Sequence, residues 1–153
     1  MVSIAIGADD AATELKKFLV CYLQQSGFVI TDYSCDRGQH ADNAYPDVAW
    51  TVANAIREGK HQRGILICGT GIGMAIVANK VPGIRAAQCH DTYSAERARK
   101  SNNAQVMTLG ARVIGPELAR SIVNSWLNAE FEGGGSTEKV EKISYYEQKV
   151  VEK

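Results

Sequence analysis

One short segment, residues 64–74, does most to restrict the folds open to this chain. It reads GILICGTGIGM, which is an apolar run followed by three glycines in alternation. The pattern predicts a strand, a tight turn and then the start of a helix. Because several backbone N–H groups of such a turn point into one small concavity, the segment is typical of an anion-binding site.

Cys68 stands at the mouth of this predicted concavity, where the strand ends. Amides aimed at its sulfur would stabilise the thiolate relative to the thiol, which would make Cys68 a base or a nucleophile. Cysteine is also a small apolar residue that commonly ends a buried strand. The segment alone leaves both interpretations open.

Strand and helix patterns alternate along the rest of the chain. Predicted strands cover residues 2–8, 28–33, 64–68, 84–89 and 105–109, and predicted helices cover residues 13–25, 45–58, 74–79, 93–100 and 116–128. This order predicts an α/β fold, a single-domain three-layer α/β/α sandwich around a five-stranded parallel, Rossmann-like sheet. Binding residues of such sheets gather beyond the carboxyl ends of the strands, here near Asp9, Cys68 and the His90-Asp91 pair.

Apolar periodicity assigns inward faces to the helices. In residues 116–128 we expect Leu118, Ile122, Val123 and Trp126 to face the core. Trp50 is expected to be a core or interface aromatic.

The character of the chain changes at residues 131–136, FEGGGS, which we interpret as a glycine hinge. A charged helix with the apolar stripe Val140, Ile143 and Tyr146 is predicted to follow. The sequence thus divides into an α/β domain at residues 1–132 and a hinge with a C-terminal helix at residues 133–153. A helix on a flexible arm often packs on a neighbouring subunit, and packing on its own domain is the alternative.

Composition excludes several function classes. The 17 Lys and Arg residues balance the 17 Asp and Glu residues, so no net field favours a nucleic acid or an anionic membrane, and a small-molecule partner is expected. Cys21, Cys35, Cys68 and Cys89 lack the close spacing of metal or redox sites, so no metal is expected. With no charged leader and no long apolar run, we expect a cytoplasmic protein with reduced thiols.

Several separate blocks of this sequence, in the same order, resemble the ribose-5-phosphate isomerase B and galactose-6-phosphate isomerase family. The blocks are IGAD at residues 6–9, YP at 45–46, ICGTGIG at 67–73, ANK at 78–80, GIRA at 83–86, YSA at 93–95, NN at 102–103, GARVIG at 110–115 and FEGG at 131–134. The resemblance implies an enzyme that interconverts phosphorylated aldoses and ketoses without a metal or other cofactor. It also implies a homodimer, or a dimer of dimers, whose active sites draw on two subunits.

The resemblance also implies roles for individual residues of the glycine turn. Cys68 would be the base that moves a proton between the first two carbons of the sugar. Thr70 and the amides of Gly71 and Gly73 would stabilise the enediolate, with Gly69 completing the turn. Preorganised donors of this kind contribute roughly 3 kcal/mol each to the stability of an oxyanion.

Other residues match the family's substrate contacts. Asp9 would contact a substrate hydroxyl, Tyr45 would form a wall of the site, Asn102 would contact the substrate and Arg112 would bind the phosphate. Two alternatives need no ligand: Asp9 and Asp10 would cap a helix, as Asp often does, and Arg112 would form a surface charge pair.

The chain departs from the family pattern at four positions. Members that act on ribose 5-phosphate usually carry a ring-opening histidine where this chain has Ser101, a histidine where it has Asp10, and an arginine where it has Gly135. A second tail arginine is Lys139 here. Two phosphate-facing groups have thus lost positive charge and one position has gained a carboxylate, which would repel a phosphate bound in the usual way.

These departures lead to two hypotheses about the site. Either the phosphate binds differently or the substrate differs, and Arg112 and Lys139 remain as phosphate-binding candidates. His90 follows a predicted strand and would be a possible substitute acid, although a helix-capping or surface role is the alternative.

The missing ring opener has a chemical explanation. An aldotetrose phosphorylated on O4 has no free hydroxyl with which to close a five-membered ring, so its isomerase needs no ring-opening residue. Residues 90–98 and 101–105 are also similar to the branch of D-erythrulose-4-phosphate isomerases. We therefore expect D-erythrulose 4-phosphate and D-erythrose 4-phosphate as the substrate pair, with ribose 5-phosphate and ribulose 5-phosphate as the alternative.

Two rival functions come from other classes. A dinucleotide-binding domain would use the three glycines with Asp91 about 20 residues downstream, although the spacing is GxGxG rather than GxGxxG and Cys68 would have no role. A non-catalytic subunit of a hetero-oligomeric isomerase is the second, against which the presence of Cys68 and Thr70 argues.

Overall fold

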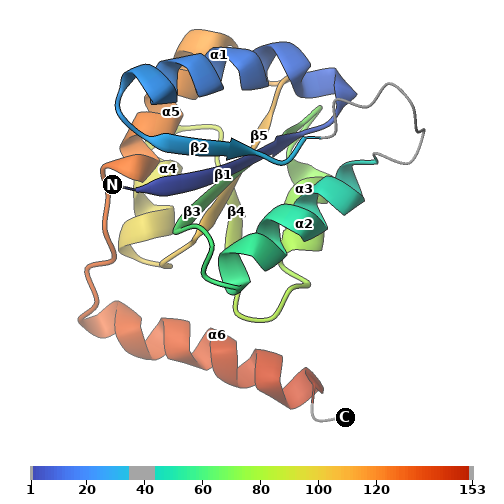
Figure 1. Cartoon of the computed structure of the whole chain (residues 1–153). Coiled ribbons are helices and arrows are strands. Elements are labelled where there is room, and N and C mark those ends of the chain that lie inside the picture. Colours follow the sequence, from blue (N-terminus) through green and yellow to red (C-terminus); the bar gives the residue numbers. More distant parts are fainter. Residues whose placement is uncertain (1, 35–43, 152–153) are drawn as a thin grey trace.

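The computed structural model describes residues 2–34 and 44–151; Cys35 and the predicted polar loop from Gly38 to Asn43 lie outside them. Five parallel strands form one sheet in the order β2-β1-β3-β5-β4 (Figure 1). The strands are β1 Ser3–Ala8, β2 Val29–Asp32, β3 Arg63–Cys68, β4 Ala86–Gln88 and β5 Val106–Gly110. The helices are the 3-10 turn η1 Asp10–Ala12, α1 Thr13–Gln25, α2 Tyr45–Arg57, α3 Ile72–Ala78, α4 Thr92–Lys100, α5 Pro116–Leu127 and α6 Gly135–Val151.

Helices cover both faces of the sheet, so the molecule has three layers (Figure 1). One apolar core joins the sheet to α1, α4 and α5, and the other joins it to α2 and α3. Consecutive residues of a strand point to opposite faces: Ile67 belongs to the first core, whereas Leu66 and Cys68 belong to the second. The predicted three-layer α/β/α sandwich with a five-stranded parallel sheet is confirmed.

The register of the strands brings their carboxyl ends to one edge. Ala8 pairs with Ile67, and Cys68 pairs with Gly110. Asp9, which follows β1, and the glycine turn, which follows β3, therefore lie side by side at this edge. The sequence expectation that polar residues gather here holds for these two segments.

One predicted helix face is wrong at a single position. Leu118 is 45% exposed, whereas Ile122, Val123 and Trp126 are fully buried as expected. The buried face of α5 starts at Ala119, one residue later, and the helical repeat then turns Leu118 toward solvent.

Trp50 does not belong to the core of its own chain. Its side chain on α2 is 52% exposed, and Val48 and Val52 on either side of it are buried. Residues two apart on a helix do not share a face, so the burial of Val48 and Val52 turns Trp50 outward. The interface role remains a prediction.

The elements also differ in length from those predicted. Strand β4 keeps only three of the six predicted residues, because Ile84 forms a turn with Val81 and the Arg85 N–H donates to the Gln105 side chain. Helix α3 starts at Ile72 rather than Met74.

The tail leaves the α/β body through two glycines with positive φ, in the segment predicted to be a hinge. Gly133 and Gly134 have φ values of 69° and 59°, which favour glycine, and α6 begins immediately after them, two residues earlier than predicted. Figure 1 shows α6 below the sheet and its covering helices. Val140 is buried, but Ile143 and Tyr146 of the predicted stripe are exposed. The division at residue 132 stays a prediction.

A buried histidine links three segments and is expected to make stability depend on pH. His61 precedes β3 and is 9% exposed; its Nδ1 lies 2.6 Å from Ser3 Oγ and its Nε2 lies 2.7 Å from Tyr33 Oη. Burial, with a smaller contribution from the Lys60 cation, lowers the pKa of His61 below its usual 6.5.

A lowered pKa means that the folded state takes up the His61 proton less readily than the unfolded state. Stability from this group is therefore full above the unfolded pKa and is lost as the pH falls through about 6.5 toward the folded pKa. We expect His61→Gln to flatten the fall in unfolding free energy between pH 7 and pH 5, measured by urea denaturation. Parallel curves for the two proteins would contradict this assignment.

Candidate active site

The turn after β3 requires glycine at its centre. Gly71 has a φ of 79°, and a Cβ built on it would lie 2.9–3.1 Å from backbone atoms of Leu109. A Cβ on Gly110 would lie 2.8 Å from the backbone of Thr70. The turn thus packs directly on the end of β5, and the buried Thr108 hydroxyl holds it there by donating to the Gly71 carbonyl at 2.7 Å.

Cys68 receives a hydrogen bond from this turn. The Gly71 N–H donates to Cys68 Sγ at 3.0 Å, and the side chain is only 5% exposed. The sequence analysis expected amides of the turn to point at the sulfur, and the Gly71 N–H does so. The Gly71 amide is therefore used by the sulfur instead of being free for an enediolate oxygen, which differs from the expected role of this amide.

Two other donors remain for an oxyanion. Gly73 lies in the first turn of α3, where N–H groups have no partner within the helix. The Thr70 hydroxyl accepts from the Ile72 N–H at 3.2 Å, which leaves its own proton available to donate. Gln88 supports this segment, because its Nε2 donates to the Thr70 carbonyl at 2.8 Å.

Asp9 caps a helix, and its carboxyl group also interacts electrostatically with the Arg112 cation. Its Oδ1 accepts from the Ala11 N–H at 3.1 Å, as the capping alternative expects. Burial is the largest influence and raises the pKa of Asp9; Asp10 raises it further, while the Ala11 amide and the Arg112 cation act against the rise. A half-buried carboxyl of this kind is suited to bind a hydroxyl. Asp10 is exposed at the start of η1.

Arg112 lies against the glycine turn. Its N–H donates to the Gly69 carbonyl at 3.0 Å, and a Cβ built on Gly69 would lie 3.5 Å from Cδ and Nη1 of Arg112. In the part of the chain that the structure describes, no ion pair joins this guanidinium to a carboxylate, unlike Arg63 and Arg99, which both pair with Glu130. The geometry therefore does not favour the alternative in which Arg112 only forms a surface charge pair.

Tyr45 forms a wall beside the same turn. A Cβ on Gly73 would overlap the Tyr45 ring and lie 2.7 Å from its hydroxyl oxygen, so only glycine permits this approach. Tyr45 begins α2, on the face of the sheet toward which Cys68 points. The ring thus lies against the glycine turn, and its role as a wall of the site stays a prediction.

His90 is turned toward β5 rather than toward solvent. Its Nε2 accepts from the Gly110 N–H at 3.0 Å. A nitrogen that accepts carries no proton, so Nε2 cannot act as an acid in this arrangement. The next residue, Asp91, caps α4 by accepting from the Ser94 N–H at 2.7 Å, a local role that needs no dinucleotide ribose.

The remaining predicted residues lie elsewhere in the chain. Helix α4 runs from the Cys68 edge back along the sheet, so Ser101 and Asn102 follow it at the amino end of β5. Four residue steps of β5, roughly 13 Å of strand, separate Val106 at that end from Gly110. Lys139 is on α6. Within one chain, the predicted site residues therefore form two separate groups. One surrounds the glycine turn, and the other follows α4 or lies on α6.

Sequence reasoning missed two residues that support the turn, Thr108 and Gln88. Both side chains act on backbone carbonyls of the glycine turn from neighbouring strands. Neither belongs to a motif, because a threonine or glutamine in a strand is ordinary until the strand order is known.

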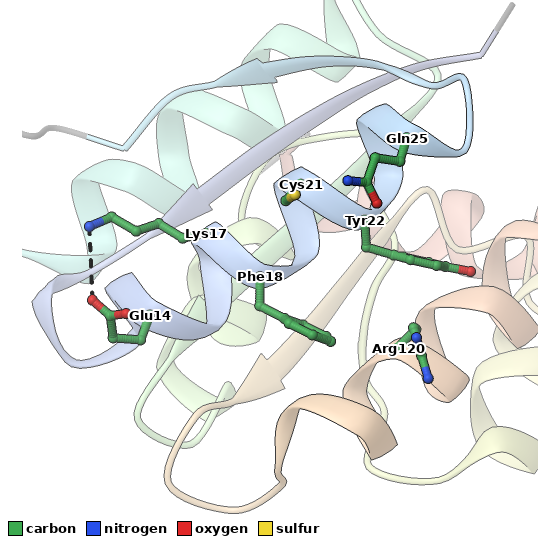
Figure 2. Close-up of a pocket in the computed structure, with 7 residues that line it drawn as sticks. All are labelled: Glu14, Lys17, Phe18, Cys21, Tyr22, Gln25 and Arg120. Carbon is green, nitrogen blue, oxygen red and sulfur yellow. Dashed lines mark ion pairs between the residues drawn. The ribbon is translucent and has the colours of Figure 1, made fainter.

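A groove of about 450 Å³ lies between α1 and α5 (Figure 2). It is lined by Glu14, Lys17, Phe18, Cys21, Tyr22, Gln25 and Arg120. None of the predicted site residues is among them, so this groove is not the candidate active site.

The described residues contain neither a metal-binding cluster nor a membrane-spanning helix. Within residues 2–34 and 44–151, no three His, Cys, Asp or Glu side chains are arranged to hold a metal ion. Over the same residues, every helix is too short or too polar to cross a membrane.

Comparison with known proteins supplies the family. The model of the family described as Ribose/Galactose Isomerase matches residues 4–143. The chain belongs to this family. The predicted family is thus confirmed, and with it the class of enzyme, an aldose-ketose isomerase of phosphorylated sugars.

Individual members of the family are similar over almost their whole length. A D-erythrulose-4-phosphate isomerase of Pectobacterium atrosepticum is 72% identical, with 96% of each chain covered. A ribose-5-P isomerase B of Listeria innocua is 50% identical, covering 97% of this chain and 99% of its own. The solved ribose-5-phosphate isomerase B of Clostridium thermocellum has a TM-score of 0.91 at 43% identity, covering 97% of this chain and 99% of that one.

Proposed function

We propose that this isomerase interconverts D-erythrulose 4-phosphate and D-erythrose 4-phosphate. The observation that carries the proposal is Ser101, which stands where relatives that open a furanose ring have a histidine, because an O4-phosphorylated tetrose has no such ring to open. The 72% identical relative, itself a D-erythrulose-4-phosphate isomerase, supports the same substrate. The 50% identical ribose-5-P isomerase B keeps ribose 5-phosphate as the alternative.

The proposed reaction moves one proton between two carbons. The Cys68 thiolate removes the proton from the carbon next to the carbonyl, and the C–H electron pair forms the double bond of an enediolate. The thiol then returns the proton to the neighbouring carbon, and a hydroxyl proton passes between the two oxygens. The Thr70 hydroxyl and the Gly73 N–H stabilise the enediolate, and Asp9 binds a substrate hydroxyl.

Arg112 is proposed to bind the phosphate. Its guanidinium has no carboxylate partner in the described part of the chain and lies against Gly69, beside the reacting sulfur. A planar fork of N–H donors suits phosphate oxygens. The Asp10 carboxylate lies nearby on η1, so the phosphate is expected to bind on the Arg112 side of the turn, away from Asp10.

A second copy of the chain is proposed to complete the site with Asn102, Ser101 and Lys139. Ser101 and Asn102 lie too far along the sheet from Cys68 of their own chain to contact one small sugar phosphate, and Lys139 is on α6. Exposed apolar residues supply surface for subunit contacts: Ile72, Ile76, Tyr93, Ile143, Tyr145 and Tyr146 are 45–72% exposed. A homodimer or a dimer of dimers follows from this proposal.

The experiment is a comparison of kcat/KM for D-erythrose 4-phosphate and D-ribose 5-phosphate with the pure chain in one buffer. We expect a preference for the tetrose of about 100-fold, the size of effect that one well-placed acid has on a proton-transfer step. A preference for the pentose would contradict the substrate proposal. An inactive pure chain would favour the hetero-oligomer, and NADH is expected to show no saturable binding.

A further inference from the structure

Arg97 lies directly beside Ser101, and no described carboxylate forms an ion pair with it. It is on the last turn of α4, and its Nη2 donates to Ser101 Oγ. Of the basic residues in that turn, Arg99 pairs with Glu130, and Lys100 pairs with Glu96 and Glu132. Among the described residues, no ion pair includes Arg97. A half-buried guanidinium without a carboxylate retains its capacity to bind an anion.

The contact also orients Ser101. Because the serine oxygen accepts from Arg97, the hydroxyl proton is left to donate elsewhere. Arg97 and Ser101 therefore keep several donors free: the remaining guanidinium N–H groups and one O–H. Such a set of donors, one of them charged, matches the anionic oxygens of a phosphate and does not match a cation.

We propose that Arg97, together with Ser101, contacts the phosphate of the substrate in the site built around Cys68 of a second copy. This inference rests on the proposed function. It assigns a source for the positive charge that this chain lacks at Asp10 and Gly135. A four-carbon substrate brings its phosphate one carbon closer to the reacting carbons, so a guanidinium beside residue 101 replaces contacts made farther away with longer sugars.

The test compares Arg97→Leu and Arg97→Lys with Arg57→Leu, which removes a basic residue from the last turn of α2 instead. We expect Arg97→Leu to lower kcat/KM for D-erythrose 4-phosphate about 10- to 100-fold, mainly through KM, the size expected for one charged hydrogen-bonding contact. The inhibition constant of inorganic phosphate should rise by a similar factor. Arg97→Lys should have values of kcat/KM and of the phosphate inhibition constant between those of the parent and Arg97→Leu, because lysine keeps the charge and loses the planar fork of donors. Arg57→Leu should match the parent in both.

A second readout needs no turnover. Inorganic phosphate, added at constant ionic strength, should raise the Tm of the parent chain and not that of Arg97→Leu. Arg97→Gln retains a donor for Ser101 without the charge, and it replaces Arg97→Leu if that variant does not fold. A role limited to stabilising the end of α4 would lower the Tm without changing the phosphate response, and that result would overturn the proposal.

The two readouts separate this inference from the proposed function. If the parent chain turns over neither sugar, the proposed function fails, and the phosphate response of the Tm still decides the role of Arg97. If the parent is active and Arg97→Leu stays within about twofold in both KM and phosphate inhibition, less than one hydrogen bond is worth, the role of Arg97 is excluded and the function stands.

Discussion

Replacing Cys68 by serine is expected to lower kcat/KM by about 10³-fold or more, the upper part of the range for loss of a general base. The serine hydroxyl remains protonated at working pH, so it cannot remove a proton from carbon. Its oxygen still accepts the hydrogen bond that the Gly71 N–H donates to Cys68 Sγ at 3.0 Å, so the turn is expected to keep its shape. The loss should therefore appear in kcat, with the Tm and the oligomeric state unchanged.

Two other cysteines provide matched controls for this substitution. Cys21 is exposed on α1, so Cys21→Ser should keep the parent activity. Cys89 lies in the core next to His90, and burial, with a smaller contribution from Asp91, raises its pKa to about 11. It is thus an uncharged thiol near neutral pH, and Cys89→Ala should retain turnover. A Cys68→Ser enzyme with more than about a tenth of the parent rate would contradict the base role, because a missing base costs at least 100-fold.

Two inactive variants are expected to restore activity when they are combined in one oligomer. Cys68→Ser and Asn102→Ala change residues at opposite ends of the sheet, and each homo-oligomer should be impaired. In a mixed dimer, one site unites the intact Cys68 of one chain with the intact Asn102 of the other. Random pairing yields half mixed dimers with one good site of two, so co-expression should recover about a quarter of the parent activity.

A matched pair of variants controls for simple mixing. Cys68→Ser and Thr70→Ala alter the same turn of one chain, so no mixed dimer of these two contains an intact site, and no recovery is expected. In mixed dimers co-purified through two different tags, one of the two sites is intact, so their recovery should be about half of the parent activity. If Cys68→Ser with Asn102→Ala recovers no more than the control pair, the site is not shared between two copies.

Local sequence patterns predicted most of the fold. Helix α1 has the predicted bounds, because the repeat of Leu15, Leu19 and Leu23 depends only on helical geometry. Errors came where neighbouring residues compete for one face, as with Leu118, or where a strand is ended by side-chain hydrogen bonds, as in β4. Tertiary packing decides which residue of a helix is buried and where a strand ends. The periodicity of the sequence alone does not predict either of these.

The candidate site was predictable to a similar degree. The thiol beside a glycine turn was visible in the sequence because the strand, the turn and the helix are contiguous. The direction of the His90 ring was not, because it depends on the Gly110 N–H twenty residues later. The approach of Tyr45 to Gly73 likewise required the packing of α2 beside α3.

The sequence by itself determined the order of strands and helices, the glycine turn beside Cys68 and the family, since all three are written in contiguous residues. Only the tertiary structure decided that the Gly71 amide serves the sulfur and that Arg112 lies against Gly69. It also decided that Asn102 and Ser101 lie at the far end of the sheet from Cys68. The physical reason is that α4 carries the chain back along the sheet, so residues that were predicted to act in one site are separated in space within one copy.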